Sequence, residues 1–137
     1  MNDLASNRRR VTRFAALAVA GTLVLAACAG PRPAADAVFV AGGIHWQGFN
    51  AYDTDLIAVD GMPLACRCGH AWLEPGDHVL TVTSLRLLGF LGDERRFAVG
   101  FTARPGRAYR VLTAWDGAAH VWVEDAETGE RVAGTRP

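Results

Sequence analysis

Two cysteines and a histidine stand close together near the middle of the chain, and they are the side chains best suited to chemistry. Cys66, Cys68 and His70 alternate within the run MPLACRCGHAW, residues 62–72. If that run is extended, all three share one face, because successive side chains of a strand point to opposite sides. Their types fit three roles: buried free thiols, a disulfide, or two thiolates and an imidazole on a soft metal such as Cu(I) or zinc.

The spacing leaves these three alternatives open. Leu64 and Trp72 would lie on the same face, which favours an inward-facing strand with buried, poorly reactive thiols. A disulfide requires the chain to turn, for which Gly69 is suited, because alternate residues of a strand lie about 6–7 Å apart and a bridge needs about 4 Å between Cβ atoms. Such a bridge would close a very short loop and be easily reduced. We therefore expect buried thiols and no cofactor, with a disulfide next and a copper or zinc site last.

A second candidate is a pair of aromatic side chains, Trp46 and Phe49. Both lie in the run IHWQGFN, residues 44–50, whose composition is typical of a loop. Tryptophans usually pack in a core or on a sheet face. We interpret this pair instead as an exposed contact patch.

The chain lacks the common catalytic motifs. It has no lysine, which excludes a Schiff-base enzyme and a Walker-type phosphate loop. Beyond residue 28 its single serine, Ser84, is outside any G-x-S-x-G motif, and neither H-E-x-x-H nor a glycine-rich dinucleotide loop is present. We expect no enzymatic activity.

The N-terminal residues have the pattern of an export signal. Four arginines within the first 13 residues precede the apolar run FAALAVAGTLVLAA, residues 14–27. A run of this length is shorter than the roughly 20 residues that a spanning helix needs, and it fits a signal peptide. We expect residues 1–27 to form a signal-peptide helix.

The end of that run, Leu25-Ala26-Ala27-Cys28, resembles the lipobox of bacterial lipoproteins. The resemblance implies cleavage before Cys28, with lipid on its sulfur and palmitate or a similar acyl chain on its amino group. Residues 28–36, rich in proline and alanine, would then be a flexible tether. The protein would be membrane-anchored on the periplasmic side. Ala29 replaces the aspartate that often retains lipoproteins in the inner membrane, which favours the outer one where a cell has two.

The remaining sequence predicts one all-β domain over residues 37–137. Short apolar runs alternate with polar residues and are separated by glycine, proline and aspartate turns, which is typical of an antiparallel β-sandwich. We expect seven or eight strands, within Ala37–Ala41, Asp55–Val59, Leu64–Trp72, Val79–Arg86, Arg96–Ala103, Ala108–Ala114, His120–Glu124 and Arg131–Ala133. The expected core contains Leu80, Val82, Phe97, Val99, Phe101, Tyr109 and Val111.

Two segments of this domain resemble PEGA-like β-sandwich modules of small cell-envelope lipoproteins. They are IAVDG, residues 57–61, and LEPGDHVLTV, residues 73–82. Later runs, FTARPGRAYRVL and VWVEDAETGERVAG, are similar to the ends of such modules. The resemblance implies a fold and a compartment but no reaction.

The net charge of the chain limits the classes of partner that it can bind. Four of the 14 arginines and one of the 14 acidic residues lie in residues 1–27, so the rest carries a formal charge of 10 − 13 = −3. This argues against nucleic acid, which requires a basic surface. We expect a lipid-anchored envelope protein with a non-catalytic binding or assembly-accessory role, contacting the membrane through its anchor and other envelope proteins. The alternative is a periplasmic copper- or redox-handling protein that uses Cys66, Cys68 and His70.

Overall fold

The computed structural model describes residues 33–66, 68–87, 93–115 and 117–137. The expected signal peptide, Cys28 and the first part of the tether therefore lie outside the described residues. Within these ranges the backbone forms ten strands, and no helix long and apolar enough to cross a bilayer is found. The strands are β1 (Val38–Gly42), β2 (Ile44–Gln47), β3 (Asn50–Val59), β4 (Met62–Pro63), β5 (His70–Leu73), β6 (Gly76–Arg86), β7 (Glu94–Ala103), β8 (Ala108–Ala114), β9 (His120–Asp125) and β10 (Arg131–Gly134).

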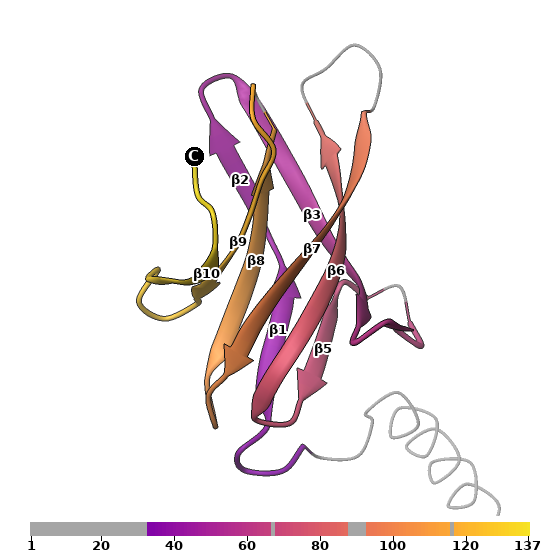
Figure 1. Ribbon diagram of the computed structural model, residues 1–137, viewed down its shortest axis with the longest axis vertical. Helices are drawn as coiled ribbons and strands as arrows, with labels where there is room; N and C mark the ends of the chain where they lie inside the picture. The colour runs from indigo at the N-terminus through magenta and orange to yellow at the C-terminus, as the bar shows by residue number, and fades with distance from the viewer. Residues whose placement is uncertain (1–32, 67, 88–92, 116) are drawn as a thin grey trace, which may run out of the picture. The chain divides into compact units, whose positions relative to one another are not determined.

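The strands form two sheets that pack together (Figure 1). Sheet A has the order β10-β9-β8-β1-β5, and sheet B has the order β2-β3-β6-β7, with the short strand β4 paired to β3. Neighbouring strands are antiparallel except β1 and β8, which run parallel. The predicted all-β sandwich is confirmed. Eight of the ten strands overlap the predicted runs, and β2 and β4 are additional short strands.

The core lies between the two sheets and follows from the alternation in the sequence. Leu80 and Val82 of β6 and Val99 and Phe101 of β7 point inward from sheet B. They meet residues of sheet A, which are Val38, Val40, Tyr109, Val111 and Val123. Six of the seven predicted core residues are buried, and the seventh, Phe97, is partly buried against the same core. Each such side chain stabilises the fold by about 1.5–3 kcal/mol.

A small polar cluster also joins the two sheets inside the core. The hydroxyl of Thr113 in β8 lies 2.8 Å from that of Thr54 in β3 and donates to that of Ser84 in β6 over 2.5 Å. All three residues are buried. The cluster therefore satisfies three hydroxyls that would each be costly to bury alone.

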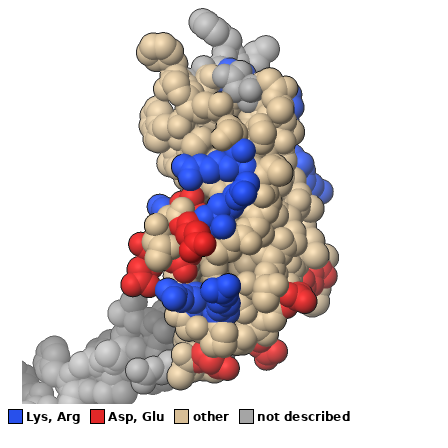
Figure 2. All heavy atoms as spheres, turned by 60° about the vertical axis from the view of Figure 1, so that its left-hand side comes forward, with Lys and Arg blue, Asp and Glu red and all other residues tan. Residues whose placement is uncertain are grey.

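The outer face of sheet A carries charges of both signs. Figure 2 shows arginine and carboxylate side chains next to one another on the side of the domain that carries β10. Arg110 donates to Glu124 over 2.8 Å, and Arg107 lies 3.1 Å from Glu127 and 3.6 Å from Asp125. These arginines have carboxylate partners, so this part of the surface has a mixed charge.

Candidate functional site

The segment with the two cysteines is a loop, and its expected extended conformation is wrong. Only His70–Leu73 forms a strand, β5, which pairs with β1. After β4 one more backbone hydrogen bond joins the segment to β3, from the amide of Leu64 to the carbonyl oxygen of Ile57 over 3.0 Å, and Gly69 turns the chain with a φ of 68°. Most of the face predicted to look inward is exposed, including Trp72 at 56%, whereas Leu64 is partly buried against the core.

Cys66 and Cys68 are joined by a disulfide, with their Cα atoms 5.3 Å apart. Both residues are exposed. The expectation of buried free thiols is therefore wrong, and the disulfide alternative describes the geometry. The 5.3 Å between these Cα atoms is shorter than the roughly 6–7 Å between alternate residues of a regular strand, so the two cysteines do not lie in one.

His70 is exposed and oriented by the same loop. Its Nδ1 lies 2.8 Å from the carbonyl oxygen of Cys68, so in this hydrogen bond the ring nitrogen donates. The ring also lies against Phe39 of β1, with 5.5 Å between centroids. Within the described ranges, no group of three or more His, Cys, Asp or Glu side chains is placed to hold a metal ion.

A hollow opens beside the disulfide on the outer face of sheet B. It has a volume of about 780 Å³, and Cys66 forms part of its wall. The floor comes from strands β3, β6 and β7, with side chains that include Asp55, Thr83, Glu94 and Arg96. Apolar residues such as Ile57 and Leu64 complete the lining. Cys66 therefore borders a depression of mixed polarity that is wide enough for part of another molecule.

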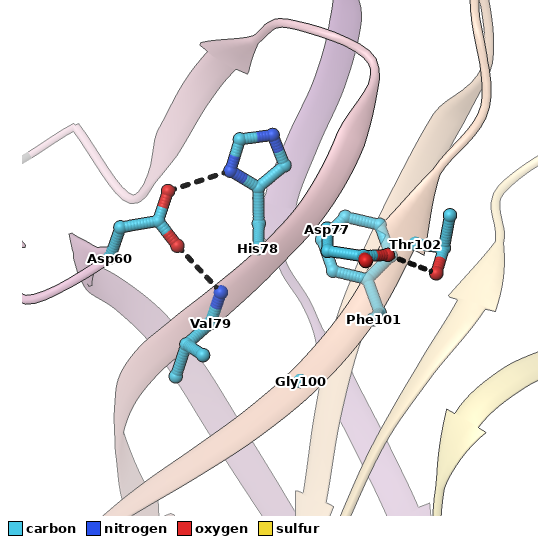
Figure 3. Close-up of a pocket in the computed structure, with 7 residues that line it drawn as sticks. All are labelled: Asp60, Asp77, His78, Val79, Gly100, Phe101 and Thr102. Atoms are coloured by element: carbon cyan, nitrogen blue, oxygen red, sulfur yellow. Dashed lines mark hydrogen bonds and ion pairs between the residues drawn. The ribbon is translucent and has the colours of Figure 1, made fainter.

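A second hollow, of about 390 Å³, lies on the other side of the β3–β4 turn, between β6 and β7, and contains His78 (Figure 3). The Nδ1 atom of His78 donates to Oδ2 of Asp60 over 2.7 Å, and its Nε2 donates to the carbonyl oxygen of Glu74 over 2.8 Å. The other oxygen of Asp60 accepts from the amide of Val79 over 2.8 Å. The sequence pair Asp60-Gly61 is typical of a turn, but the pairing of Asp60 with His78 is not among the sequence predictions.

The turn itself explains where the Asp60 carboxylate points. Asp60 and Gly61 have φ values of 52° and 77°, as the two central residues of a type I′ hairpin turn do. This turn joins β3 to β4 and directs the carboxylate at the start of β6. The Asp-Gly pair was readable from the sequence, but the histidine 18 positions later was not a visible partner.

The hydrogen bonds shift both pKa values. Burial lowers the pKa of His78, but the hydrogen bonds to Asp60 and to Glu74, with the charges of Asp60 and Asp77, outweigh it and raise the pKa above 6.5. The amide of Val79 and the ring of His78 lower the pKa of Asp60. Because both ring nitrogens already donate within the protein, His78 fits a structural role, in which it holds the β3–β4 turn against β6, better than the role of a general base.

The predicted contact residues Trp46 and Phe49 are exposed, at 66% and 93%. Trp46 lies on strand β2, so the assignment of the whole run 44–50 to a loop is wrong, and Phe49 lies in the turn between β2 and β3. An edge strand of four residues followed by glycine carries too little alternation to be distinguished from a loop.

Three further exposed apolar side chains lie at the same end of sheet B as this pair, and together the five form what we call the end patch. Ile44 is opposite Asp53, which is opposite Leu85, and Trp46 is opposite Ala51, whose carbonyl accepts from the amide of Leu87. The register therefore places neighbouring outward-facing residues at one end of sheet B. The exposed fractions of the added members, Ile44, Leu85 and Leu87, are 53%, 38% and 43%.

Polar residues lie within and beside the end patch. Asp53, which is exposed, lies between Ile44 and Leu85 in one row across the strands, and the exposed Glu94 follows Leu85 in the same row. On the opposite face of the sheet, Arg86 donates from Nε to Oδ1 of Asn50 over 3.2 Å. The end patch is therefore a mixed surface in which apolar side chains predominate, and such surfaces are common in protein–protein interfaces.

Comparisons with models of protein families, with curated proteins and with solved structures find no match to this chain.

Proposed function

We propose that this chain is a lipid-anchored binding module of the cell envelope that holds a partner protein at its end patch, without catalysing a reaction. The observation that carries the proposal is the grouping of five exposed apolar side chains, two of them aromatic, at one end of sheet B. Single exposed apolar residues are ordinary, but several of them gathered at one end of a sheet indicate a contact surface.

The end patch has enough apolar surface to matter energetically. Trp46 and Phe49 are 66% and 93% exposed. With roughly 150–250 Å² for each aromatic side chain and about 25 cal/mol per Å², covering both contributes on the order of 6–10 kcal/mol before the costs of association. Aromatic residues are also enriched among the side chains that dominate binding energy.

The position of the end patch favours a protein partner over the anchoring bilayer. The described chain begins at Pro33, at the end of the sandwich opposite the β2–β3 turn (Figure 1). A tether of residues 28–36 spans at most about 30 Å when fully extended. With a lipid on Cys28, the end nearest the tether would stay close to the membrane, and the end patch would face the aqueous compartment. The carboxylates of Asp53, within the end patch, and Glu94, beside it, also disfavour contact with anionic lipid headgroups.

A photo-crosslinking residue at position 49 of the full chain, expressed in its own cells, tests the end patch. We expect one discrete protein adduct that disappears when Trp46→Asp is added. The same photo-crosslinking residue at position 104, in the β7–β8 turn at the opposite end, should give no such adduct. Trp72→Asp, an equally drastic change at another exposed tryptophan, should leave the adduct from position 49 intact. Adducts with lipid alone, or the same adduct from position 104, would contradict the proposal.

The anchor is tested separately with Cys28→Ser. Because the acyl groups would supply the membrane affinity of the mature chain, the variant should lose lipid labelling and remain unprocessed before residue 28. A variant that is still cleaved there, and still sediments with washed membranes, would show that the anchor lies elsewhere.

A further inference from the structure

The Cys66–Cys68 disulfide does little for the fold. It encloses only Arg67, and a bridge stabilises a protein less the shorter the loop that it closes. The chain on both sides is held by other contacts: Pro63 pairs with Ala58 of β3, and the carbonyl of Gly69 accepts from the amide of Gly42 over 3.0 Å. Opening the bridge therefore leaves the strands around it in place.

The same disulfide is accessible to other molecules. Both cysteines are exposed, and Cys66 lines the open hollow of about 780 Å³ on the outer face of sheet B. Thiol–disulfide exchange needs a thiolate to approach one sulfur in line with the bond that breaks, so access is the first requirement. A bridge that is exposed and dispensable for folding has the properties of a reactive disulfide rather than a structural one.

We propose that Cys66 and Cys68 form a redox-active pair that accepts two electrons from a dithiol on another polypeptide, which lies in the hollow beside Cys66. This inference is independent of the end patch and of the lipid anchor. The lining of the hollow is mixed, with the polar and charged side chains of Asp55, Thr83, Glu94 and Arg96 beside apolar residues such as Ile57 and Leu64, so it suits an extended segment that carries both polar and apolar side chains.

The exchange balances within the two molecules. A partner thiolate attacks Sγ of Cys66, a bond forms between those sulfurs, and the Cys66–Cys68 bond breaks with its electron pair on Cys68. The second partner thiolate then attacks the partner sulfur of the mixed disulfide and releases Cys66 as a thiolate. The partner dithiol is oxidised to a disulfide, the pair is reduced, and the two protons of the partner thiols pass through solvent to Cys66 and Cys68.

The test uses the full chain in detergent with Cys28→Ser, so that the pair contains the only two cysteines. The probes are dithiothreitol and a short peptide of polar and apolar residues with one cysteine. We expect dithiothreitol to reduce the folded protein at a rate within about threefold of that in denaturant, with unchanged far-UV circular dichroism. Acid quenching and peptide mapping should place the mixed disulfide mainly on Cys66.

A substitution in the hollow tests whether the peptide binds there, or whether the disulfide reacts only because it is exposed. Thr83→Trp fills the floor beside the bridge and should slow the peptide reaction at least about fivefold while leaving the dithiothreitol rate unchanged. Three results would overturn the inference: about 100-fold slower reduction of the folded than of the unfolded protein, mixed disulfide mainly on Cys68, or a peptide rate insensitive to Thr83→Trp. Free thiols that bind Cu(I) in the isolated protein would also overturn it and support metal handling.

Discussion

The hydroxyl cluster between the sheets makes a quantitative prediction for Thr113→Val. Valine keeps the shape of the side chain but removes the oxygen that bonds to both Thr54 and Ser84. The strands on either side are otherwise unchanged, because valine favours a strand at least as strongly as threonine. The substitution therefore isolates one buried oxygen.

The magnitude follows from the two hydrogen bonds that are lost. Each contributes about 0.5–1.5 kcal/mol to stability, and a buried hydroxyl left without its partner costs about 1–3 kcal/mol. Thr54 and Ser84 are 3% and 0% exposed, so solvent cannot replace Thr113 without rearrangement. We expect Thr113→Val to lower the free energy of unfolding by about 2–4 kcal/mol.

The triple variant with Thr54→Val, Ser84→Ala and Thr113→Val provides the decisive comparison. Removing all three hydroxyls leaves none unsatisfied. The triple variant should therefore lose about 1 kcal/mol of unfolding free energy, well below the sum of the losses of the three single variants. The assay is urea unfolding followed by tryptophan fluorescence, with the three single variants measured alongside. A single-variant cost below about 0.5 kcal/mol, or a triple variant that equals the sum, would refute the reasoning.

Three further outcomes are expected from the same unfolding assay. Phe101→Ala should cost about 3–5 kcal/mol because it opens a cavity in the core, whereas Phe49→Ala, at an exposed position, should stay within about 0.5 kcal/mol of the parent; equal costs would contradict the assigned core. Gly42→Ala should destabilise by about 1–3 kcal/mol, since a methyl group there would overlap a carbonyl oxygen of β3, and a neutral result would contradict this packing. Because the folded pKa of His78 lies above 6.5, its protonation stabilises the fold below that pH, and the contribution is lost as pH rises through the raised pKa. The difference in unfolding free energy between the parent and Asp60→Asn should therefore narrow between about pH 6 and pH 8. A difference that stays constant would show that the hydrogen bond between Asp60 and His78 does not cause it.

The sequence predicted the fold best where two signals coincided. In β7 the alternation of Phe97, Val99 and Phe101 with smaller or polar residues continues over the whole strand, and turn residues follow it. The strand β8 matches the predicted range Ala108–Ala114 at both ends. Alternation and turn chemistry are local, so they can be read without knowing the partner strands.

The parts that could not be predicted depend on contacts between distant residues. Whether Cys66 and Cys68 meet depends on where β5 begins, and this is set by its pairing with β1, about 30 residues earlier. The hydrogen bond between Asp60 and His78 depends on the register of β3 against β6. Trp46 and Phe49 were identified as exposed, but Ile44, Leu85 and Leu87 joined them only through sheet pairing.

The place of β1 in sheet A has a mechanical consequence. β1 is the first strand of the domain, yet it lies inside the sheet, antiparallel to β5 on one side and parallel to β8 on the other. Tension transmitted from the N-terminal side pulls along the axis of β1, so it loads the hydrogen bonds of two ladders together in shear instead of opening them one at a time. A domain attached in this way resists being unravelled from its attachment point, whereas a first strand at the sheet edge would have only one ladder to hold it.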